Sequence, residues 1–438
     1  MKKYQLCSKE ELNLEIEKLE KEYDKYKSMN LKLNMARGKP CKEQLDLSMA
    51  MMDVLNSSAD LNCEDGIDCR NYGVLGGIEE CKRLLGDIIE VPSKNIIIYG
   101  NSSLDVMYEC ISRSYSHGVL GEKPWCKLDK PVKWLCPVPG YDRHFAITEY
   151  FGFEMINIPM NSDGPDMDMV EELIKDEMVK GIWCVPKYSN PDGTTYSEEV
   201  VKRFANLKPA AKDFRIYWDN AYSVHHLYDD NQDFLLEILD ECKKAGNPDL
   251  VYKFTSTSKI TFPGSGIAAL ATSDRNIEEI ENQMGIETIG FDKVNQLRHV
   301  RFFKNLDGVK KQMKLHANIL RPKFELVLDE FDKNLSDLDI AWWTKPHGGY
   351  FISLYCREPV ASFVVKDCKD LGLTLTPAGS AYPYHLDPDN SNIRIAPSFP
   401  ALDDLKVACE ILTLSVKLES AKYLYNLFIN HYLLFNYY

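Results

Sequence analysis

VYKFTSTSKITFPGSGIAAL, residues 251–270, is the stretch around which the chain is organised. Its first four residues are mostly apolar and predict a buried strand. Hydroxyl residues follow at 255–258 and lead to Lys259, and glycines come next at Gly264 and Gly266. A lysine among hydroxyl groups at a strand end can be desolvated and form a Schiff base, while nearby donors hold an anion. A solvated surface lysine is the commoner alternative, so the residues upstream and downstream decide between them.

The overall composition excludes several classes of protein. A net charge of −14 and a pI near 5.2 argue against a general nucleic-acid or anionic-membrane binder, because those partners favour a basic surface. The N-terminus lacks the apolar run of a signal peptide, and no apolar run is long enough to span a membrane, so we expect a cytoplasmic protein. The 13 cysteines form no CxxC pair, and Cys63 and Cys69 lack zinc-site spacing. We therefore expect free thiols and no metal.

Strand and helix patterns alternate from about residue 95 to the Lys259 strand, which predicts an α/β fold with a mostly parallel sheet and helices on both faces. Within this pattern we expect a loop at PGYDRH (139–144) and a helix from Asp166 to Lys180. Ligands of such sheets bind beyond the carboxyl ends of the strands. Long helical patterns over 293–334 and then short strands predict a smaller α+β domain. We expect residues 1–55 to contribute to this small domain, 56–315 to form the large domain and 316–438 to complete the small one. The aromatic stretch 423–438 fits either a packed terminal helix or an extension.

Polar residues gather at the predicted strand ends in an order that suits pyridoxal 5′-phosphate. That cofactor needs a lysine, a carboxylate at its pyridine nitrogen, donors for its phenolic oxygen, an aromatic ring on its face and an anion cradle. The candidates in chain order are Gly100, Asn101, Ser102, Ser103, Tyr141, Asn190, Asp219, Tyr222, Ser256, Lys259 and Arg394. Each has an ordinary alternative: a capped helix start at 100–103, a turn at 190–193, an exposed tyrosine or a solvated arginine.

Taken together, the motifs resemble a known family. PGYDRH (139–144), NPDGTTYS (190–197), DNAY (219–222), STSK (256–259) and NIRIAPSF (392–399) are similar to the class I, fold-type I pyridoxal-phosphate-dependent aminotransferases. LNMARGKP (33–40), RNYGVLGG (70–77) and STSKITFPGSG (256–266) look closer to bacterial aspartate aminotransferases of the MocR-like kind. The resemblance covers about residues 31–414. It implies a large domain with a mostly parallel seven-stranded sheet, and a homodimer with shared active sites.

The resemblance also implies a role for each candidate. Lys259 would form the Schiff base and carry protons, Asp219 would face the pyridine nitrogen, and Arg394 would bind the substrate α-carboxylate. The remaining cofactor and substrate contacts would come from Asn190 and Tyr222 at the phenolic oxygen, Tyr141 on the ring, Gly100, Asn101, Ser102, Ser103 and Ser256 at the phosphate, Tyr72 of a neighbouring subunit, and Gly38 at the substrate. Typical members carry a phosphate-binding arginine about eight residues past the lysine, where this chain has Ser265, Gly266 and Ile267.

The implied reaction moves an amino group from aspartate or another dicarboxylic amino acid to a 2-oxo acid such as 2-oxoglutarate. A second carboxylate needs a second cation, and Arg298 and Arg301 are the candidates, with arginines on a helix surface as the alternative. Broader amino acid specificity, β-lyase activity and a pyridoxal-phosphate-binding transcriptional regulator are competing readings of the same fold. A serine acyl-enzyme with Ser256 to Lys259 as S-x-x-K lacks the accompanying SDN and KTG elements.

Overall fold

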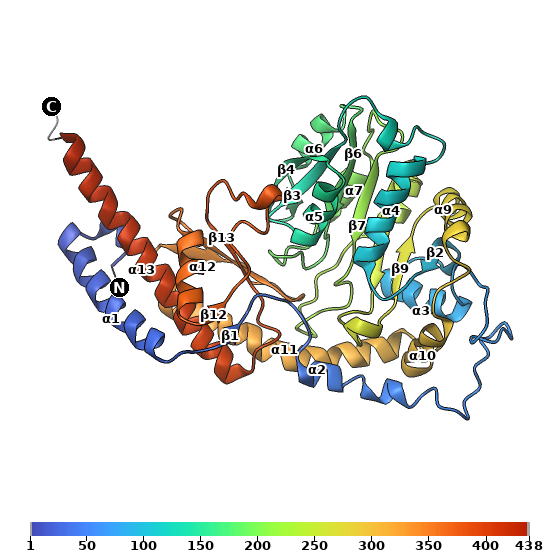
Figure 1. Cartoon of the computed structure of the whole chain (residues 1–438), viewed down its shortest axis with the longest axis horizontal. Coiled ribbons are helices and arrows are strands. Elements are labelled where there is room, and N and C mark those ends of the chain that lie inside the picture. Colours follow the sequence, from blue (N-terminus) through green and yellow to red (C-terminus); the bar gives the residue numbers. More distant parts are fainter. Residues whose placement is uncertain (1, 436–438) are drawn as a thin grey trace.

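An eight-stranded sheet forms the centre of the large domain (Figure 1). The coordinates are a computed structural model that describes residues 2–435, with side chains described to residue 429. The strand order is β2-β9-β8-β7-β6-β3-β4-β5, in which β8, β7, β6, β3 and β4 run parallel. The strands are β2 (Ile96–Ile98), β3 (Lys133–Val138), β4 (Glu154–Asn161), β5 (Gly164–Pro165), β6 (Val179–Cys184), β7 (Arg215–Asp219), β8 (Val251–Ser256) and β9 (Ala268–Ala271).

The sheet differs from the predicted one in its strand count. The seven expected strands are present, and β5 adds an eighth by pairing antiparallel with the end of β4. β5 is only two residues long, too short for a periodic pattern. The helix predicted from Asp166 to Lys180 is also shorter than expected: α6 (Met167–Leu173) ends early, and the chain enters β6 at Val179.

Alternating side chains of the strands enter hydrophobic cores on opposite faces of the sheet, one core on the first face and two on the second. Trp134 and Trp183 pack with one face's helices, whereas their neighbours Leu135 and Ile182 pack on the other. The first face is covered by α4 (Ser103–His117), α5 (Asp142–Tyr150) and α9 (Asp274–Glu287). The second is covered by α6, α7 (Glu198–Ala205), α8 (Ile238–Lys244), α3 (Glu79–Ile89) and α10 (Lys293–Phe303). Burial on both faces explains why the central strands read as continuous apolar runs.

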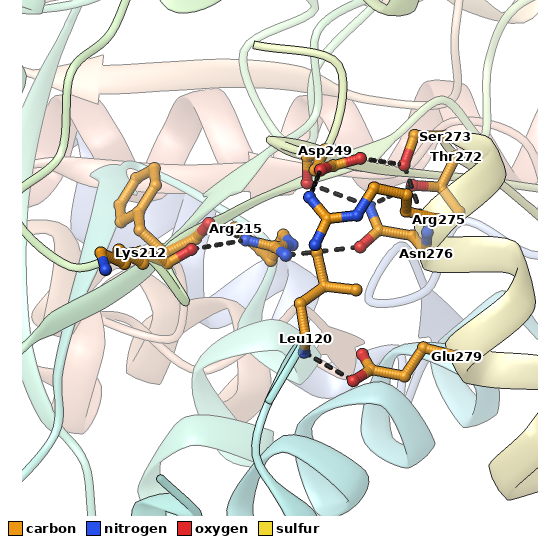
Figure 2. A network of polar contacts seen from close by, with 10 residues as sticks. Leu120, Lys212, Arg215, Asp249, Thr272, Ser273, Arg275, Asn276 and Glu279 are labelled. Atoms are coloured by element: carbon orange, nitrogen blue, oxygen red, sulfur yellow. Dashed lines mark hydrogen bonds and ion pairs between the residues drawn. The ribbon is translucent and has the colours of Figure 1, made fainter. Parts of the chain in front are cut away.

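A buried polar network braces the amino-terminal end of the sheet (Figure 2). Arg215, the first residue of β7, is 2% exposed and donates to the carbonyl of Lys212 (3.2 Å) and to Asn276 Oδ1 (3.3 Å). Asn276 in turn donates to Thr272 Oγ1 at 2.9 Å, just after β9. The network therefore ties β7 to β9 and α9 at the end of β7 opposite Asp219.

The small domain combines both ends of the chain. Its antiparallel sheet has the order β10-β11-β13, and a parallel pair, β1-β12, joins the N-terminal segment to it. The strands are β1 (Leu33–Asn34), β10 (Ala341–Trp343), β11 (Ile352–Cys356), β12 (Leu373–Thr374) and β13 (Asn392–Ile395). The helices are α1 (Lys9–Ser28), α2 (Lys42–Asp46), α11 (Leu306–Leu335), α12 (Ala361–Asp370) and α13 (Leu402–Phe435). α1 begins with a capping box in which Ser8 and Glu11 bond reciprocally.

One hydrophobic cluster joins the first and last helices. Leu12, Ile16 and Leu19 of α1 lie in the same core as Leu405 and Leu412 of α13. Figure 1 shows the two helices side by side at one end of the molecule. The N-terminal segment thus packs against the C-terminal helix, and the predicted division into domains at 55 and 315 stays a prediction.

Two further features concern the long helices. α11 runs without interruption across the predicted boundary at residue 315, so the two domains share this helix. α13 continues as a helix into the aromatic stretch as far as Phe435, while residues 436–438 lie outside the described residues, as do side chains from 430 onward. Within residues 2–435, no helix is both long and apolar enough to cross a lipid bilayer.

Candidate active site

The candidate residues converge where β7 and β8 end side by side. Asp219 is the last residue of β7 and Ser256 the last of β8, and the two strands pair in parallel with Asp219 opposite Phe254. Lys259 follows three residues after β8. The parallel register therefore brings the predicted carboxylate and the predicted lysine to one edge of the sheet.

Asp219 is a buried carboxylate with one oxygen unused. The residue is 4% exposed, and its Oδ2 lies 3.1 Å from Nε2 of the buried His144. The His144 ring stacks on Trp183, with centroids 4.5 Å apart and planes 13° from parallel. Oδ1 has no hydrogen-bond partner among the described residues. A buried carboxylate oxygen without a partner is costly, so this atom suits a ligand that carries an N–H.

Lys259 lies beside two neighbouring tyrosine rings, whose centroids are 6.2 Å apart. Its Nζ is 5.1 Å from the ring centroid of Tyr222 and 5.8 Å from that of Tyr350. Burial lowers the pKa of Lys259 from its ordinary value, and the nearby Asp219 carboxylate opposes part of that shift. Burial raises the pKa of the Tyr222 phenol well above its ordinary value, so this hydroxyl stays protonated and can donate a hydrogen bond.

A buried network holds the turn that carries Lys259. Gln44 Nε2 donates to Tyr350 Oη at 2.9 Å, and Tyr350 donates to the carbonyl of Lys259 at 3.4 Å. Burial lowers the pKa of His316 to about 4, so its ring is neutral. Its Nε2 lies 3.0 Å from the Ile260 carbonyl, and Nδ1 lies 3.0 Å from Gln44 Nε2. Nε2 therefore donates to Ile260, and Nδ1 accepts from Gln44.

A cluster of hydroxyls and free N–H groups lies beside Lys259. Ser102 is the N-cap of α4 but makes no side-chain capping bond, which leaves the first N–H groups of the helix for an anion. Ser258 Oγ donates to the Asn101 carbonyl at 3.0 Å, and Ser256 Oγ donates to Ser258 Oγ at 3.2 Å. A side chain added at Gly100 would meet nothing within 4 Å, so space adjoins this turn. The arrangement can bind a phosphate group.

Arg394 connects this edge to the small domain. It lies on β13 opposite Ser353 of β11. Its Nη1 donates to Asp142 Oδ1 at 2.9 Å and to Asn190 Oδ1 at 3.3 Å, and Nη2 donates to Thr376 Oγ1 at 3.2 Å. The guanidinium of Arg394 therefore contacts residues of both domains, including the predicted Asn190.

Gly38 and the Arg394 guanidinium both lie against the Phe351 ring. The Arg394 Cζ atom is 5.2 Å from the centroid of the Phe351 ring. A Cβ atom at Gly38 would lie 2.4 Å from Cζ of that ring, closer than real contacts allow. Only glycine lets the N-terminal segment pass this close to the Phe351 ring, which gives a physical reason for Gly38 in the turn between Met35 and Pro40.

Comparison with known proteins identifies the family. The family model described as Aspartate amino-transferase matches residues 7–427. A relative from Corynebacterium glutamicum, named aspartate aminotransferase, is 46% identical over 418 residues, which covers 95% of this chain and 96% of that protein. The chain is a fold-type I aminotransferase. This result confirms the resemblance drawn from the motifs and makes the protein an enzyme.

Solved structures agree with the aminotransferase fold. An aspartate transaminase from Corynebacterium glutamicum superposes with a TM-score of 0.94 at 45% identity, over 96% of this chain and 99% of that one. The α-aminoadipate aminotransferase of Thermus thermophilus, complexed with N-(5′-phosphopyridoxyl)-L-leucine, has a TM-score of 0.71 at 17% identity, over 90% and 93% of the two chains. At that identity the second likeness concerns the fold alone.

In the part of the chain that the structure describes, three predicted site residues of the aminotransferase make no contact with Lys259 or Arg394. Tyr72 is 81% exposed. Arg301 is exposed and donates to the carbonyl of Asn62 at 3.4 Å. Arg298 donates to Ser265. Among the described residues, none of the three contacts Lys259 or Arg394 directly, so any role of Tyr72 or Arg301 at a site requires a second subunit.

The PGYDRH motif contains two residues near Asp219: Tyr141, which was predicted as a site residue, and His144, which was not. The half-buried Tyr141 ring meets the His144 ring edge-on at 4.9 Å, and burial raises the pKa of Tyr141 to about 12. Both residues belong to PGYDRH, which was expected to be a loop; α5 begins at Asp142, so His144 lies in its first turn. The position of His144 two residues into this helix was the available signal for its contact with Asp219.

Proposed function

We propose that this aminotransferase moves the amino group of aspartate, or of another dicarboxylic amino acid, to a 2-oxo acid such as 2-oxoglutarate. The proposed cofactor is pyridoxal 5′-phosphate joined to Lys259. One observation supports it above all: a buried carboxylate oxygen of Asp219 without a partner lies at the same strand edge as a desolvated lysine. The name of the relative that is 46% identical supports aspartate as the donor.

The residues present fit this cofactor. Asp219 Oδ1 would accept a hydrogen bond from a protonated pyridine nitrogen, and the protonated Tyr222 and the buried Asn190 would donate to the phenolic oxygen. The uncapped start of α4 and the hydroxyls of Ser256 and Ser258 would hold the phosphate. Bound there, pyridoxal phosphate supplies an electron sink that stabilises negative charge at the substrate Cα.

Lys259 carries the proton transfers in this proposal. A lowered pKa leaves a larger fraction of its amine unprotonated near neutral pH, which is the form that attacks a carbonyl and accepts a proton. The neighbouring Tyr222 and Tyr350 rings limit where Nζ can move on the side that they occupy. Once released from the cofactor, Nζ therefore takes the proton from the substrate Cα.

Arg394 binds the substrate α-carboxylate in this proposal. Its planar fork suits bidentate contact with a carboxylate. The Asp142 carboxylate already occupies Nη1 of Arg394. An incoming substrate carboxylate would replace or share this contact, and Asn190 would orient the fork from the other domain.

A second copy of the chain completes the site in this proposal. Tyr72, Ile286 and Ile289 are 81%, 91% and 60% exposed, an unusual degree of exposure for large apolar side chains. Tyr72 and Ile289 line one cavity of about 450 Å³ on this face. We expect a homodimer that covers these residues and delivers Tyr72 to the partner's phosphate and Arg301 to the second carboxylate of its substrate.

The first experiment tests the lysine and the cofactor together. Wild-type protein supplied with pyridoxal phosphate should show the visible absorbance of a lysine-bound cofactor, and Lys259→Ala should abolish it. Lys345→Ala, which removes an exposed lysine paired with Asp332, is the matched control and should keep the spectrum. A wild-type protein that stays colourless in excess cofactor, or a Lys259→Ala variant with an unchanged spectrum, contradicts the proposal.

A second experiment tests substrate and assembly. A panel of amino acids with 2-oxoglutarate should give the highest kcat/KM for aspartate or glutamate, and Arg301→Ala should lower that value without changing kcat/KM for alanine. Mixing inactive Lys259→Ala subunits with weakened Tyr72→Ala subunits should restore activity, because a mixed dimer contains one site with both residues intact. A monomer in solution, or mixing without recovery, contradicts the shared site.

A further inference from the structure

The anion-binding end of the site lacks a cation in the expected stretch. The family resemblance places an arginine shortly after the lysine, but residues 264–266 are Gly, Ser and Gly. A phosphate monoester carries nearly two negative charges at neutral pH. Hydroxyls and N–H groups alone would leave most of that charge without a counter-ion in a partly buried site.

Arg298 reaches this end from α10. Its Nη2 donates to the side-chain oxygen of Ser265, within a short 3-10 turn, η5 (Pro263–Ser265). The anion cradle contacts the same turn, since Asn101 Nδ2 donates to the Pro263 carbonyl at 3.1 Å. Arg298 and the start of α4 therefore contact a single three-residue turn. Among the described residues, no other arginine or lysine donates a hydrogen bond to this turn.

Neighbours of Arg298 on α10 fix the helix against the lysine segment. Asn295 Nδ2 donates to the Gly266 carbonyl at 2.8 Å. Burial lowers the pKa of His299 to about 4, and its Nδ1 donates to the Asn295 carbonyl at 2.9 Å. The other nitrogen, Nε2, accepts from Thr257 at 3.2 Å and from Thr261 at 3.0 Å. α10 is thus held to residues on both sides of Lys259, which positions the Arg298 guanidinium.

Arg298 also lacks an acidic partner. Its protein contacts are to Ser265 and to the Asn295 side chain, and no carboxylate pairs with it among the described residues. Its Nε is buried and makes no hydrogen bond. A partly buried guanidinium without a counter-ion is unfavourable, so an anion at this position would stabilise it.

We propose that Arg298 binds the phosphate of the cofactor and replaces, from a different helix, the arginine missing after Lys259. A side chain added at Gly264 would meet nothing within 4 Å, so open space adjoins the turn that Arg298 contacts. The inference rests on the proposed cofactor. It assigns Arg298 to the cofactor of its own subunit, in place of the substrate-carboxylate role considered from the sequence.

Pyridoxal, which lacks the phosphate, gives the direct test. Apo-protein is titrated with pyridoxal phosphate and with pyridoxal, and binding is followed by the visible absorbance of the lysine-bound aldehyde. Arg298→Gln should weaken the binding of pyridoxal phosphate by about 10- to 100-fold, the range of a lost charge-assisted contact. It should leave the affinity for pyridoxal within about threefold of the wild-type value. Lys345→Ala, which removes an exposed lysine paired with Asp332, should change neither. Arg298→Lys should lie between wild type and Arg298→Gln.

Each other outcome overturns the inference. Equal weakening of both aldehydes by Arg298→Gln would mean that Arg298 only positions the Ser265 turn. Unchanged binding of both aldehydes would mean that Arg298 is only a surface residue. A loss of the preference for aspartate at unchanged cofactor affinity would mean that Arg298 binds the substrate. Ser265→Ala removes the protein partner but not the charge, and it should keep the preference for the phosphorylated aldehyde. If Arg298→Gln fails to fold, the preference of Arg298→Lys and Ser265→Ala for pyridoxal phosphate over pyridoxal still tests the inference. A wild-type protein that binds neither aldehyde refutes the proposed function instead.

Discussion

Removing the charge of Asp219 should slow catalysis far more than it changes the structure. Asp219→Asn keeps the shape of the side chain and a contact to His144 but leaves no carboxylate to hold a pyridine nitrogen protonated. Coulomb's law gives about 5.5 kcal/mol for opposite unit charges about 3 Å apart at an effective dielectric constant of about 20. A lost charge-assisted hydrogen bond alone costs about 1.5–3 kcal/mol. We therefore expect kcat/KM for aspartate to fall by about 10²- to 10⁴-fold.

Two controls separate the electronic effect from a structural one. Asp249→Asn alters the polar network at the other end of the sheet, where Asp249 contacts Ser273 at 2.5 Å and Arg275 at 2.7 Å, and should lower stability without lowering kcat. In Asp219→Ala, a cofactor methylated on its pyridine nitrogen carries a permanent positive charge and should recover part of the activity. Wild-type kcat/KM in Asp219→Asn would refute the role of this carboxylate.

Three other changes have defined outcomes. Asp142→Asn removes a competitor for the Arg394 guanidinium and should lower KM for aspartate severalfold in steady-state kinetics; a raised KM would mean that Asp142 orients the arginine. Gly38→Ala places a methyl group against the Phe351 ring and should raise KM with little change in the cofactor spectrum. Because burial lowers the pKa of Lys259, loading of the apo-protein with pyridoxal phosphate should reach its plateau at a lower pH than for an ordinary lysine. Neutralising the neighbouring carboxylate, which opposes that shift, should move the plateau to still lower pH.

The residues that follow strands were the ones that sequence patterns could locate. Asp219 and Lys259 each come after a buried apolar run, and parallel strands place such residues at one edge, so their proximity followed from topology. Tyr222 and Asn190 were found through motifs. The eighth strand was missed because two residues carry no period, and α6 was made too long because its polar spacing continued through the turn before β6.

The supporting residues could not be located in this way. Gln44 and His316 lie on α2 and α11, far from Lys259 in the sequence, and neither residue type has a local pattern that points to the site. Arg298 looked like a helix-surface arginine because the side chain it contacts, Ser265, is brought to it only by tertiary packing. Contacts that depend on several helices docking together are set by the fold, not by nearby sequence.

The parallel pairing of β1 with β12, together with the shared core of α1 and α13, has a consequence for how the chain is made. During synthesis the first 40 or so residues leave the ribosome long before the C-terminal segments they pack against, whose buried residues run from Leu320 to Ala421. The eight-stranded sheet needs none of these late residues for its strand pairings. The N-terminal segment therefore stays unpaired while the large domain forms. Because the buried residues of the shared core end at Ala421, we expect deletions after Ala421 to be tolerated better than deletions before it.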